Sequence, residues 1–342
     1  MPLGLPVNAA SLASALSLTA LAGAAELRVP ESFASIAQAL AASQPGDTIS
    51  IAPGTYQTGT IQVPAHAITI AGRGAPSATV LQGVEFAFLN SAAQRTMRDV
   101  TLREFTGYGA IRVEGSSVRV ERVIVDAAEV HGIFLTGGAL VEMLDCEIRG
   151  CRSGGYAYVN GTWNATRTRF IGNINDDGVA VAHGYGGAVA FHIGSGGTFT
   201  ECDFIGNYAA TGGAIGLSFG GTRVFQACRF EDNSSPAGAV LSTEFGASGL
   251  VRNSVFCRHT ATDLWGNWID GGGNQFFPNG CTAPCIADIV PDGVVNGADM
   301  AIVLNFWGTA GSQFPGVDID GNGIVNGSDL AAVLNAWGPC PQ

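Results

Sequence analysis

One short segment recurs through the middle of this 342-residue chain, and its spacing limits the folds that are available. Each copy alternates apolar and polar residues, as in MRDVTL, VERVIV, MLDCEI, TECDF and QACRF. The copies end at Leu102, Val125, Ile148, Phe170, Phe204, Phe230 and Phe256. One turn of structure therefore returns every 22 to 26 residues, with one longer insertion before Phe204.

A second column of small or apolar residues stands two positions before each of these ends. Its members are Val100, Val123, Cys146, Thr168, Cys202, Cys228 and Ser254. Alternation with a period of two is typical of a strand with one buried face. Short strands at a fixed period, separated by glycine-rich turns, predict a right-handed parallel β-helix in which each turn stacks on the one before.

The outward columns alternate in charge from turn to turn. The first reads Asp99, Arg122, Asp145, Arg167, Glu201; the second Glu147, Arg169, Asp203, Arg229; the third Arg103, Asp126, Arg149. Opposite charges on stacked neighbours favour a single register. Since an exposed pair contributes only about 0.2 to 1 kcal/mol, the columns indicate register control rather than a large gain in stability.

Three later turns repeat the sequences FIGN, FIGN and FEDN, each followed by GGAV, GGAI or AGAV. We expect Asn173, Asn207 and Asn233 to form an amide ladder at one corner. These FxxN and GGA[IV] pairs resemble the repeats of bacterial polymorphic outer-membrane proteins and other secreted right-handed β-helix proteins. The segment VPESFASIAQALAASQPGDTISIAPGTY, residues 29–56, resembles the start of the pectin lyase-like superfamily. The resemblance implies an N-terminal helix that caps the open end of the coil.

Composition excludes some classes of protein and favours export. The net charge is −12 and all 16 basic residues are arginine, which argues against nucleic-acid binding. Residues 1–25 contain the apolar run SLASALSLTALAGA and an A-x-A-like site at Ala22 to Ala24, which predicts a signal peptide, although no basic residue precedes the run. No later run reaches the ~18 apolar residues of a membrane span. We expect a secreted or cell-surface protein.

Candidate chemistry in the β-helix is confined to one insertion. Pectin lyase-like folds carry lyases, esterases and hydrolases of acidic polysaccharides, and also adhesins without catalysis. The insertion NINDDGVAVAHGYGG, residues 173–187, brings Asp176, Asp177 and His183 close in sequence, and His192 follows. One interpretation is an acid/base or sugar-binding cluster on a protruding loop. The other is a polar surface loop with an incidental histidine.

Tyr156, Tyr158 and Asn160, on the turn before this insertion, could add a surface on which sugars stack.

The eight cysteines divide into two groups. Cys146, Cys202 and Cys228 belong to the inward column, where we expect small buried hydrophobes. In an exported chain, disulfides are expected among the others. Cys257 with Cys281 and Cys285 with Cys340 are the plausible pairs, although sequence alone does not determine connectivity.

The C-terminal region carries a calcium-loop pattern twice. DIDGNGIVNGSD, residues 318–329, places oxygen ligands at positions 1, 3, 5, 9 and 12, with a glycine at the sharp turn. The expected ligands are Asp318, Asp320, Asn322, the Ile324 carbonyl, Asn326 and Asp329. DIVPDGVVNGAD, residues 288–299, repeats the loop with Val290 at position 3. Its remaining ligands are Asp288, Asp292, the Val294 carbonyl, Asn296 and Asp299. We expect Ca²⁺ in both loops, held more weakly in the first.

A short helix follows each loop, with the sequences MAIVLNFWG and LAAVLNAWG. Residues 286–338 resemble a type I dockerin, which implies helices that dock onto a cohesin module. The basic residues common on dockerin recognition surfaces are missing from these helices. We expect a small core closed by two tryptophans, formed by Met300, Ile302, Val303, Leu304, Leu330, Val333, Leu334, Trp307 and Trp337.

The predicted architecture is mainly β: a signal peptide (1–25), a right-handed parallel β-helix with an N-terminal capping helix (26–280) and a small α-helical dockerin-like calcium-binding module (281–342). The first functional hypothesis is an exported protein that binds or degrades polysaccharide and is tethered to a cohesin-like or cell-surface protein. If it is an enzyme, it is a polysaccharide lyase or a glycoside hydrolase. The alternative is a non-catalytic surface or matrix adhesin or structural protein.

Overall fold

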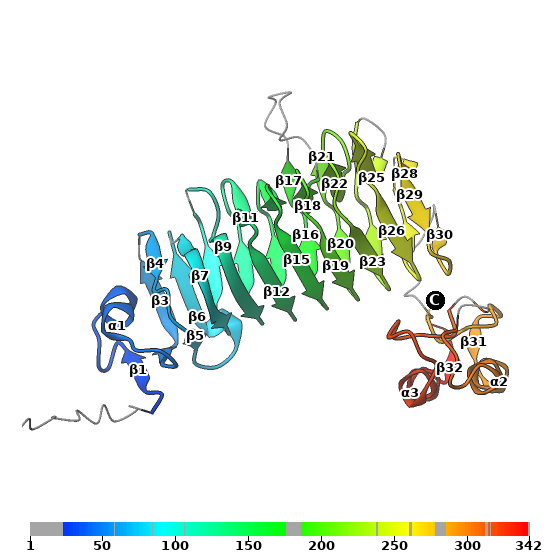
Figure 1. Cartoon of the computed structure of the whole chain (residues 1–342), viewed down its shortest axis with the longest axis horizontal. Helices are drawn as coiled ribbons and strands as arrows, with labels where there is room; N and C mark the ends of the chain where they lie inside the picture. Colours follow the sequence, from blue (N-terminus) through cyan, green and yellow to red (C-terminus); the bar gives the residue numbers. More distant parts are fainter. Residues whose placement is uncertain are drawn as a thin grey trace, which may run out of the picture.

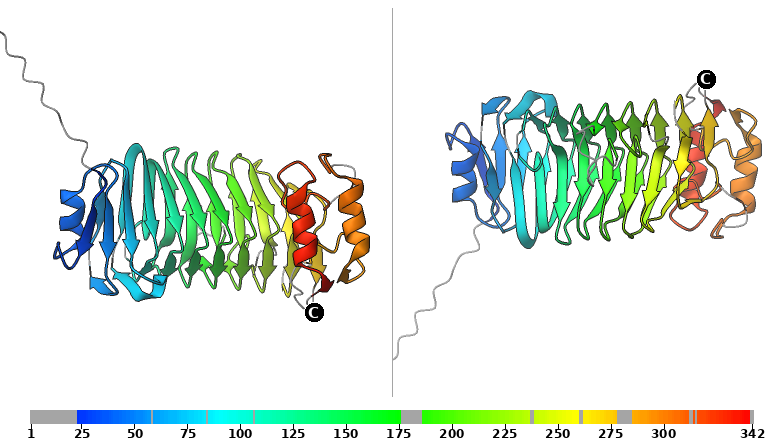
Figure 2. Two further views of the ribbon diagram at one scale, coloured as in Figure 1. Left: turned by 90° about the horizontal axis from the view of Figure 1, so that it is seen from below. Right: turned by 90° about the horizontal axis from the view of Figure 1, so that it is seen from above.

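The computed structural model describes residues 23–57, 59–83, 85–105, 107–175, 186–236, 239–259, 262–277, 285–311, 314 and 316–340. The strands from residue 26 to residue 277 wind into a parallel β-helix, with coil stacked on coil along one axis (Figure 1). A small helical region, the C-terminal module, lies beside the last coils in all three views (Figures 1 and 2). The predicted signal peptide falls almost wholly outside the described residues.

The described strands of the β-helix form three faces. Face I holds β4 (Ile61–Val63), the starts of β7 (Phe86–Arg98) and β9 (Ile111–Glu121), β11 (His131–Thr136), β14 (Ser153–Ala157), β18 (Val189–Phe191), β22 (Ile215–Ser218), β25 (Ala239–Glu244) and β28 (Thr262–Trp265). Face II holds β1 (Glu26–Val29), β2 (Thr48–Ile51), β5 (Ile68–Gly72), the ends of β7 and β9, β12 (Leu140–Leu144), β15 (Thr162–Thr166), β19 (Gly197–Thr200), β23 (Arg223–Gln226), β26 (Gly249–Arg252) and β29 (Trp268–Asp270).

Face III is a ten-stranded sheet of the described chain. It holds β3 (Gly54–Gln57), β6 (Thr79–Gln82), β8 (Thr101–Arg103), β10 (Ile124–Asp126), β13 (Glu147–Arg149), β16 (Arg169–Ile171), β20 (Asp203–Ile205), β24 (Arg229–Glu231), β27 (Val255–Cys257) and β30 (Gln275–Phe277). A 3-10 turn, η1 (Pro76–Ala78), precedes β6, and β17 (Ile174–Asn175) pairs with β21 (Tyr208–Ala209) beside this face. The predicted β-solenoid is confirmed.

A helix covers the N-terminal end of the coil, as expected from residues 29–56. Helix α1 (Ile36–Ala42) begins at Ser35, whose hydroxyl accepts a hydrogen bond from the Gln38 amide at 3.2 Å. Ile36 and Leu40 are buried with the core of the first coil. The helix therefore shields apolar side chains that the first turn would otherwise leave in water (Figure 1).

The two inward columns are confirmed. Both are buried in the repeated segments. From β16 onward, the column that ends each segment becomes a stack of phenylalanine rings with centroids 4.7 to 5.0 Å apart, formed by Phe170, Phe204, Phe230, Phe256 and Phe276. Cys146, Cys202 and Cys228 are free, buried thiols in the other column, as predicted. Cys151, which the sequence analysis left unassigned, is a fourth.

The charge columns form ion pairs between neighbouring turns. Arg122 contacts Asp99 at 2.6 Å, and Arg167 contacts Asp145 at 2.7 Å. Asp126 lies between Arg103 and Arg149, at 3.2 and 3.1 Å. Members of the first column all have positive φ, from 46° to 59°, so each marks the same tight corner between faces II and III.

The amide ladder is also confirmed. The Asn207 Nδ2 atom donates to the carbonyl oxygen of Phe170 and to Oδ1 of Asn233, both at 2.9 Å. Its Oδ1 accepts from the backbone and side-chain nitrogens of Asn173, at 3.1 and 3.0 Å. Asn173, Asn207 and Asn233 are fully buried, so the ladder satisfies polar groups that water does not reach.

The C-terminal module contains two helices, α2 (Gly297–Asn305) and α3 (Gly327–Asn335), and an antiparallel pair, β31 (Val294–Val295) with β32 (Gly338–Pro339). The expected disulfide between Cys285 and Cys340 is present. Cys257 is also disulfide-bonded, and Cys281, its predicted partner, lies outside the described residues. Among the described helices, none combines the length and apolar character needed to cross a membrane.

The core expected for this module was partly wrong. Val303 and Val333 are buried, with Met300, Ile302 and Leu330 packed partly against them. Four residues that were expected in the core are instead about half exposed: Leu304, Leu334, Trp307 and Trp337. Each helix spans little more than two turns and turns only one narrow face to the core. The residue after the central valine therefore points elsewhere.

We predict that Asn207→Ala lowers the free energy of unfolding by about 2 to 4 kcal/mol, because it leaves a buried carbonyl and a buried amide without partners. Denaturant unfolding followed by circular dichroism measures the loss. Asn267→Ala, at an exposed turn position, is the control and should change stability by less than about 0.5 kcal/mol. Equal losses in both variants would contradict the assigned role of the ladder.

We also predict that Asp126→Asn makes the acid side of the stability profile flatter. Burial acts to raise the pKa of Asp126, but hydrogen bonds and charge from Arg149 and Arg103 outweigh it and hold the pKa below its usual value. A lowered folded pKa stabilises the fold above pH ~4 and loses that effect as the pH falls through the folded pKa. The difference in melting temperature between wild type and variant should therefore shrink below pH ~4. Exposed Glu142→Gln should show no such convergence.

Candidate functional site

A row of aromatic rings follows face I from one turn to the next, and we call it the aromatic stripe. Its members are Tyr108, His131, Phe134, Tyr156, Tyr158, His192, Phe219 and Phe245. Tyr108 precedes β9, while His192, Phe219 and Phe245 directly follow β18, β22 and β25. The stripe therefore crosses six consecutive turns and runs obliquely over face I, from the start of β9 to the end of β25.

The rings contact their neighbours on the next turn, and several of them are also exposed to solvent. Phe219 and Phe245 stack with centroids 4.7 Å apart and an angle of 4° between their planes. Since carbon atoms in contact lie about 3.5 to 4.0 Å apart, this separation requires laterally offset rings. Tyr108, Tyr158, Phe219 and Phe245 are 60%, 39%, 45% and 63% exposed. The stripe is thus an apolar surface that solvent reaches mainly at these four rings.

One charged group borders the stripe. The guanidinium of Arg112 lies 4.8 Å from the centre of the Tyr108 ring. The same side chain pairs with Glu114, with Nε to Oε1 at 2.8 Å, and lies 3.7 Å from Glu85. Glu85 also accepts a hydrogen bond from the Tyr108 amide at 3.0 Å. One arginine therefore pairs with both carboxylates at this end of the stripe.

The structure tests the placement of only some predicted residues. Asp176, Asp177 and His183 lie outside the described residues. His192 is 9% exposed and lies between Tyr158, at 5.7 Å, and Phe219, at 4.9 Å. It therefore connects two more exposed rings of the stripe.

Tyr156 and Tyr158, suggested as a sugar-stacking surface, both belong to the stripe, but Tyr156 is only 6% exposed. Burial raises the pKa of Tyr156 to about 12, so its phenol stays protonated at neutral pH.

Sequence analysis missed five members of the stripe: Tyr108, His131, Phe134, Phe219 and Phe245. A usable signal was present for two of them, because Phe219 and Phe245 are 26 residues apart, the same spacing as Phe204, Phe230 and Phe256. Both have positive φ, near 55° and 50°, and so occupy equivalent corners.

The second of the two predicted calcium loops, residues 318–329, gathers three carboxylates. Oxygen atoms of Asp318, Asp320 and Asp329 lie within 4.8 Å of one another. Asp329 is buried and accepts hydrogen bonds from the amides of Ile319, Asp320 and Asn326, so it also caps the start of α3. Burial, together with the charges of Asp329 and Asp320, raises the pKa of Asp318.

One oxygen of this loop is left for a cation. Asp318 Oδ2 accepts a hydrogen bond from the Gly323 amide at 2.9 Å, whereas Asp318 Oδ1 is buried and has no hydrogen-bond partner among the described residues. An oxygen-only donor set with an unsatisfied buried carboxylate oxygen fits a hard divalent cation such as Ca²⁺.

The first loop has a weaker arrangement. Asp299 caps α2 as Asp329 caps α3. Asp288 accepts hydrogen bonds from the amides of Asp292 and Gly293, at 3.2 and 2.9 Å. Among the described His, Cys, Asp and Glu side chains, the group that gathers around Asp288 consists of Cys285 and Cys340, whose sulfurs the disulfide already uses.

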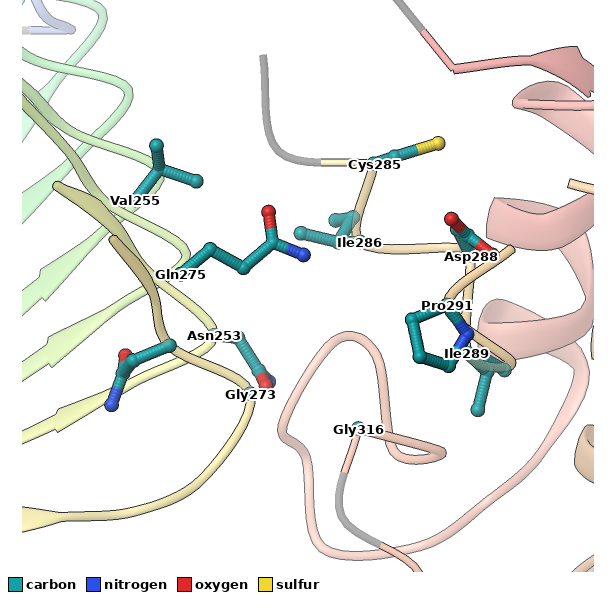
Figure 3. A pocket seen from close by; sticks show the side chains of 11 residues that line it. Asn253, Val255, Gly273, Gln275, Cys285, Ile286, Asp288, Ile289, Pro291 and Gly316 are labelled. Atoms are coloured by element: carbon teal, nitrogen blue, oxygen red, sulfur yellow. The ribbon is translucent and has the colours of Figure 1, made fainter. Parts of the chain in front are cut away.

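A cleft of about 280 Å³ separates the last coil from the C-terminal module (Figure 3). Asn253, Val255 and Gln275 line it from the β-helix, and the Gln275 side chain extends toward Ile286 of the module. Asp288 and Pro291 line the opposite side. The two parts of the chain therefore approach each other closely without forming one continuous core.

Comparison with known families decides the class of the coil. A family profile described as the right handed beta helix region matches residues 86–260, just over half of the chain. The chain belongs to this right-handed β-helix family. The matched residues include every member of the aromatic stripe. A search of curated proteins found no match to the chain.

Solved structures with a similar fold include three carbohydrate-active proteins. The PL6 family alginate lyase AlyGC is 13% identical with a TM-score of 0.40. The match covers 72% of this chain but only 40% of the lyase chain. An alginate lyase from Paenibacillus sp. str. FPU-7 is 12% identical with a TM-score of 0.38, covering 72% and 99%. The catalytic domain of a GH87 alpha-1,3-glucanase is 13% identical with a TM-score of 0.29, covering 73% and 68%. At such identities the likeness concerns the fold.

Proposed function

We propose that this right-handed β-helix protein is exported and binds polysaccharide along the aromatic stripe, while the C-terminal module acts as a calcium-dependent, dockerin-like tether to a protein partner. The observation that carries the binding proposal is the unbroken row of rings, four of which are exposed, on six successive turns of face I.

The stripe suits an extended glycan for two reasons. Aromatic rings offer a flat apolar surface that packs against the C–H faces of sugar rings and removes both from water. Successive turns of a β-helix lie about 4.8 Å apart, a step close to the length of one pyranose unit. Rings on consecutive turns thus repeat along the axis at nearly the spacing of the sugars in a chain.

We restrict the proposal to binding rather than cleavage. Polysaccharide cleavage by a pair of acids needs one carboxyl that donates a proton and one that stays ionised. At the Arg112 end of the stripe, the carboxylates of Glu85 and Glu114 are both engaged in ion pairs with the same guanidinium. A non-catalytic surface or matrix protein therefore agrees best with the described part of face I.

We predict that Tyr158→Ala and Phe219→Ala each weaken polysaccharide binding about tenfold, because each removes one exposed ring surface worth roughly 1.4 kcal/mol. Affinity electrophoresis and calorimetry against alginate, pectin, xylan and a neutral α-glucan measure the effect. Trp337→Ala, an exposed ring on the C-terminal module, is the control and should bind as the wild type does.

The same incubations are assayed for new reducing ends and unsaturated products. Release of either by the wild-type protein would contradict the restriction to binding. Absence of binding to the whole panel would remove the polysaccharide hypothesis.

The tether proposal rests on the repeated loop and helix. The two repeats present equivalent exposed apolar side chains at the ends of α2 and α3, namely Leu304 with Trp307 and Leu334 with Trp337. Exposed apolar groups in such a pattern are typical of a protein-docking surface rather than of a solvated face. A partner surface of apolar character, similar in role to a cohesin, would cover them.

We predict that Asp318→Ala combined with Asp320→Ala abolishes the tighter calcium site and leaves the β-helix folded. Both side chains lie in the oxygen cluster, whereas Asp329 is retained because its carboxylate caps α3. Calorimetric titration with Ca²⁺ and far-ultraviolet circular dichroism measure the two outcomes. Glu142→Ala, an exposed acid on face II, is the control. An unchanged binding heat in the double variant would contradict the assignment.

A further inference from the structure

The second calcium loop touches the side of the β-helix. Gly321, with φ of +67°, lies so close to the Gln226 side chain that a methyl group on Gly321 would stand 2.0 Å from Gln226 Nε2. Gln226 is the last residue of β23 on face II and is only 5% exposed. A larger side chain at position 321 would therefore require the Gln226 amide to move.

The β-helix holds Gln226 in place from its own side. Arg252, on the next turn, donates hydrogen bonds to Gln226 Oε1 from Nη2 at 2.6 Å and from Nε at 3.1 Å. The two residues occupy paired positions on β23 and β26. Since the carbonyl oxygen is fixed by Arg252, the surface that meets Gly321 is already ordered in the coil.

Gly321 stands between two residues of the calcium loop. Asp320 and Asn322, its chain neighbours, occupy positions 3 and 5 of the ligand pattern. The Asn322 amide donates to Asp320 Oδ1 at 3.1 Å, which makes this stretch a compact turn. Coordination of a cation and contact with Gln226 thus constrain the same three residues.

A second region of approach lies at the cleft. There the last coil contributes Asn253 and Gln275, while the module contributes Ile286, Pro291 and Gly316, which closely precedes the second loop (Figure 3). The module therefore meets the coil at two separate places, and a shift of the second loop would alter both.

We propose that calcium binding by the second loop and docking of the C-terminal module onto the Gln226 surface are thermodynamically linked. This inference rests on the calcium binding proposed above. Without a cation, the carboxylates of Asp318, Asp320 and Asp329 repel one another and the loop expands, which moves Gly321 off Gln226. By reciprocity, docking that favours the compact loop raises its calcium affinity by the same factor.

The test uses the full chain and a substitution on the β-helix, at a residue that is not itself an expected calcium ligand. We expect Gln226→Trp to block docking and to weaken calcium binding to the second loop about fivefold or more in calorimetric titration. Thr166→Trp is the matched control, because Thr166 lies in the same column of face II two turns earlier. It should bind calcium as the wild type does. Gln226→Ala, which adds no bulk, should shift affinity in the same direction by less.

Small-angle scattering supplies a second measurement. The maximum dimension of the wild-type protein should increase when calcium is removed with a chelator, whereas Gln226→Trp should have the larger dimension with and without calcium. Equal calcium affinities in wild type and Gln226→Trp would overturn the linkage while leaving the calcium site intact. No calcium binding by the wild type would overturn both the site and the linkage, and the two failures are thereby distinguishable.

Discussion

Parallel stacking of equivalent coils is the constraint on which the rest of this structure depends. In such a coil each residue lies about 4.8 Å above its counterpart in the previous turn, so every side chain must tolerate a copy of itself or a complementary group as a neighbour. Three kinds of side chain meet that demand here. Phenylalanine rings stack in the core, buried asparagines pass hydrogen bonds from turn to turn, and surface acids alternate with arginines. The register follows from all three at once.

The same stacking explains the aromatic stripe. A ring at one corner provides an apolar neighbour for the ring at the same corner of the next turn. That second ring therefore leaves less apolar surface in water than it would alone. Phe219 and Phe245 occupy equivalent corner positions with positive φ, and the repetition brings their rings into offset contact. Among the residues that the structure describes, no further protein layer covers the exposed members of the stripe. The stacking that stabilises the coil therefore also creates a surface for an elongated ligand whose repeat matches that of the coil.

Residues whose spacing is constant were predictable from sequence, and residues that depend on variable turns or on a small core were not. The inward columns, the asparagine ladder and the ion pairs of Asp99 and Asp126 follow from counting along a regular period. The connections that lead to face I differ in length, so the number of residues between the phenylalanine column and face I is not constant. Phe134 was missed for this reason. In the C-terminal module, apolar character alone does not separate Val303, which is buried, from Leu304, which is exposed, because a two-turn helix has room for one buried stripe.

The two ends of the coil are treated differently, which gives the C-terminal module its physical role. At the start, α1 covers the apolar core with its own buried side chains. At the last described coil, Phe276 stacks on Phe256 yet remains 45% exposed, and the module packs beside the coil rather than across its end. A module with so small a core needs further constraints to stay ordered. The disulfide between Cys285 and Cys340 supplies one, and contact with Gln226 supplies another. Charge repulsion inside the second loop opposes both, so a bound cation there would act on the module and on its attachment together.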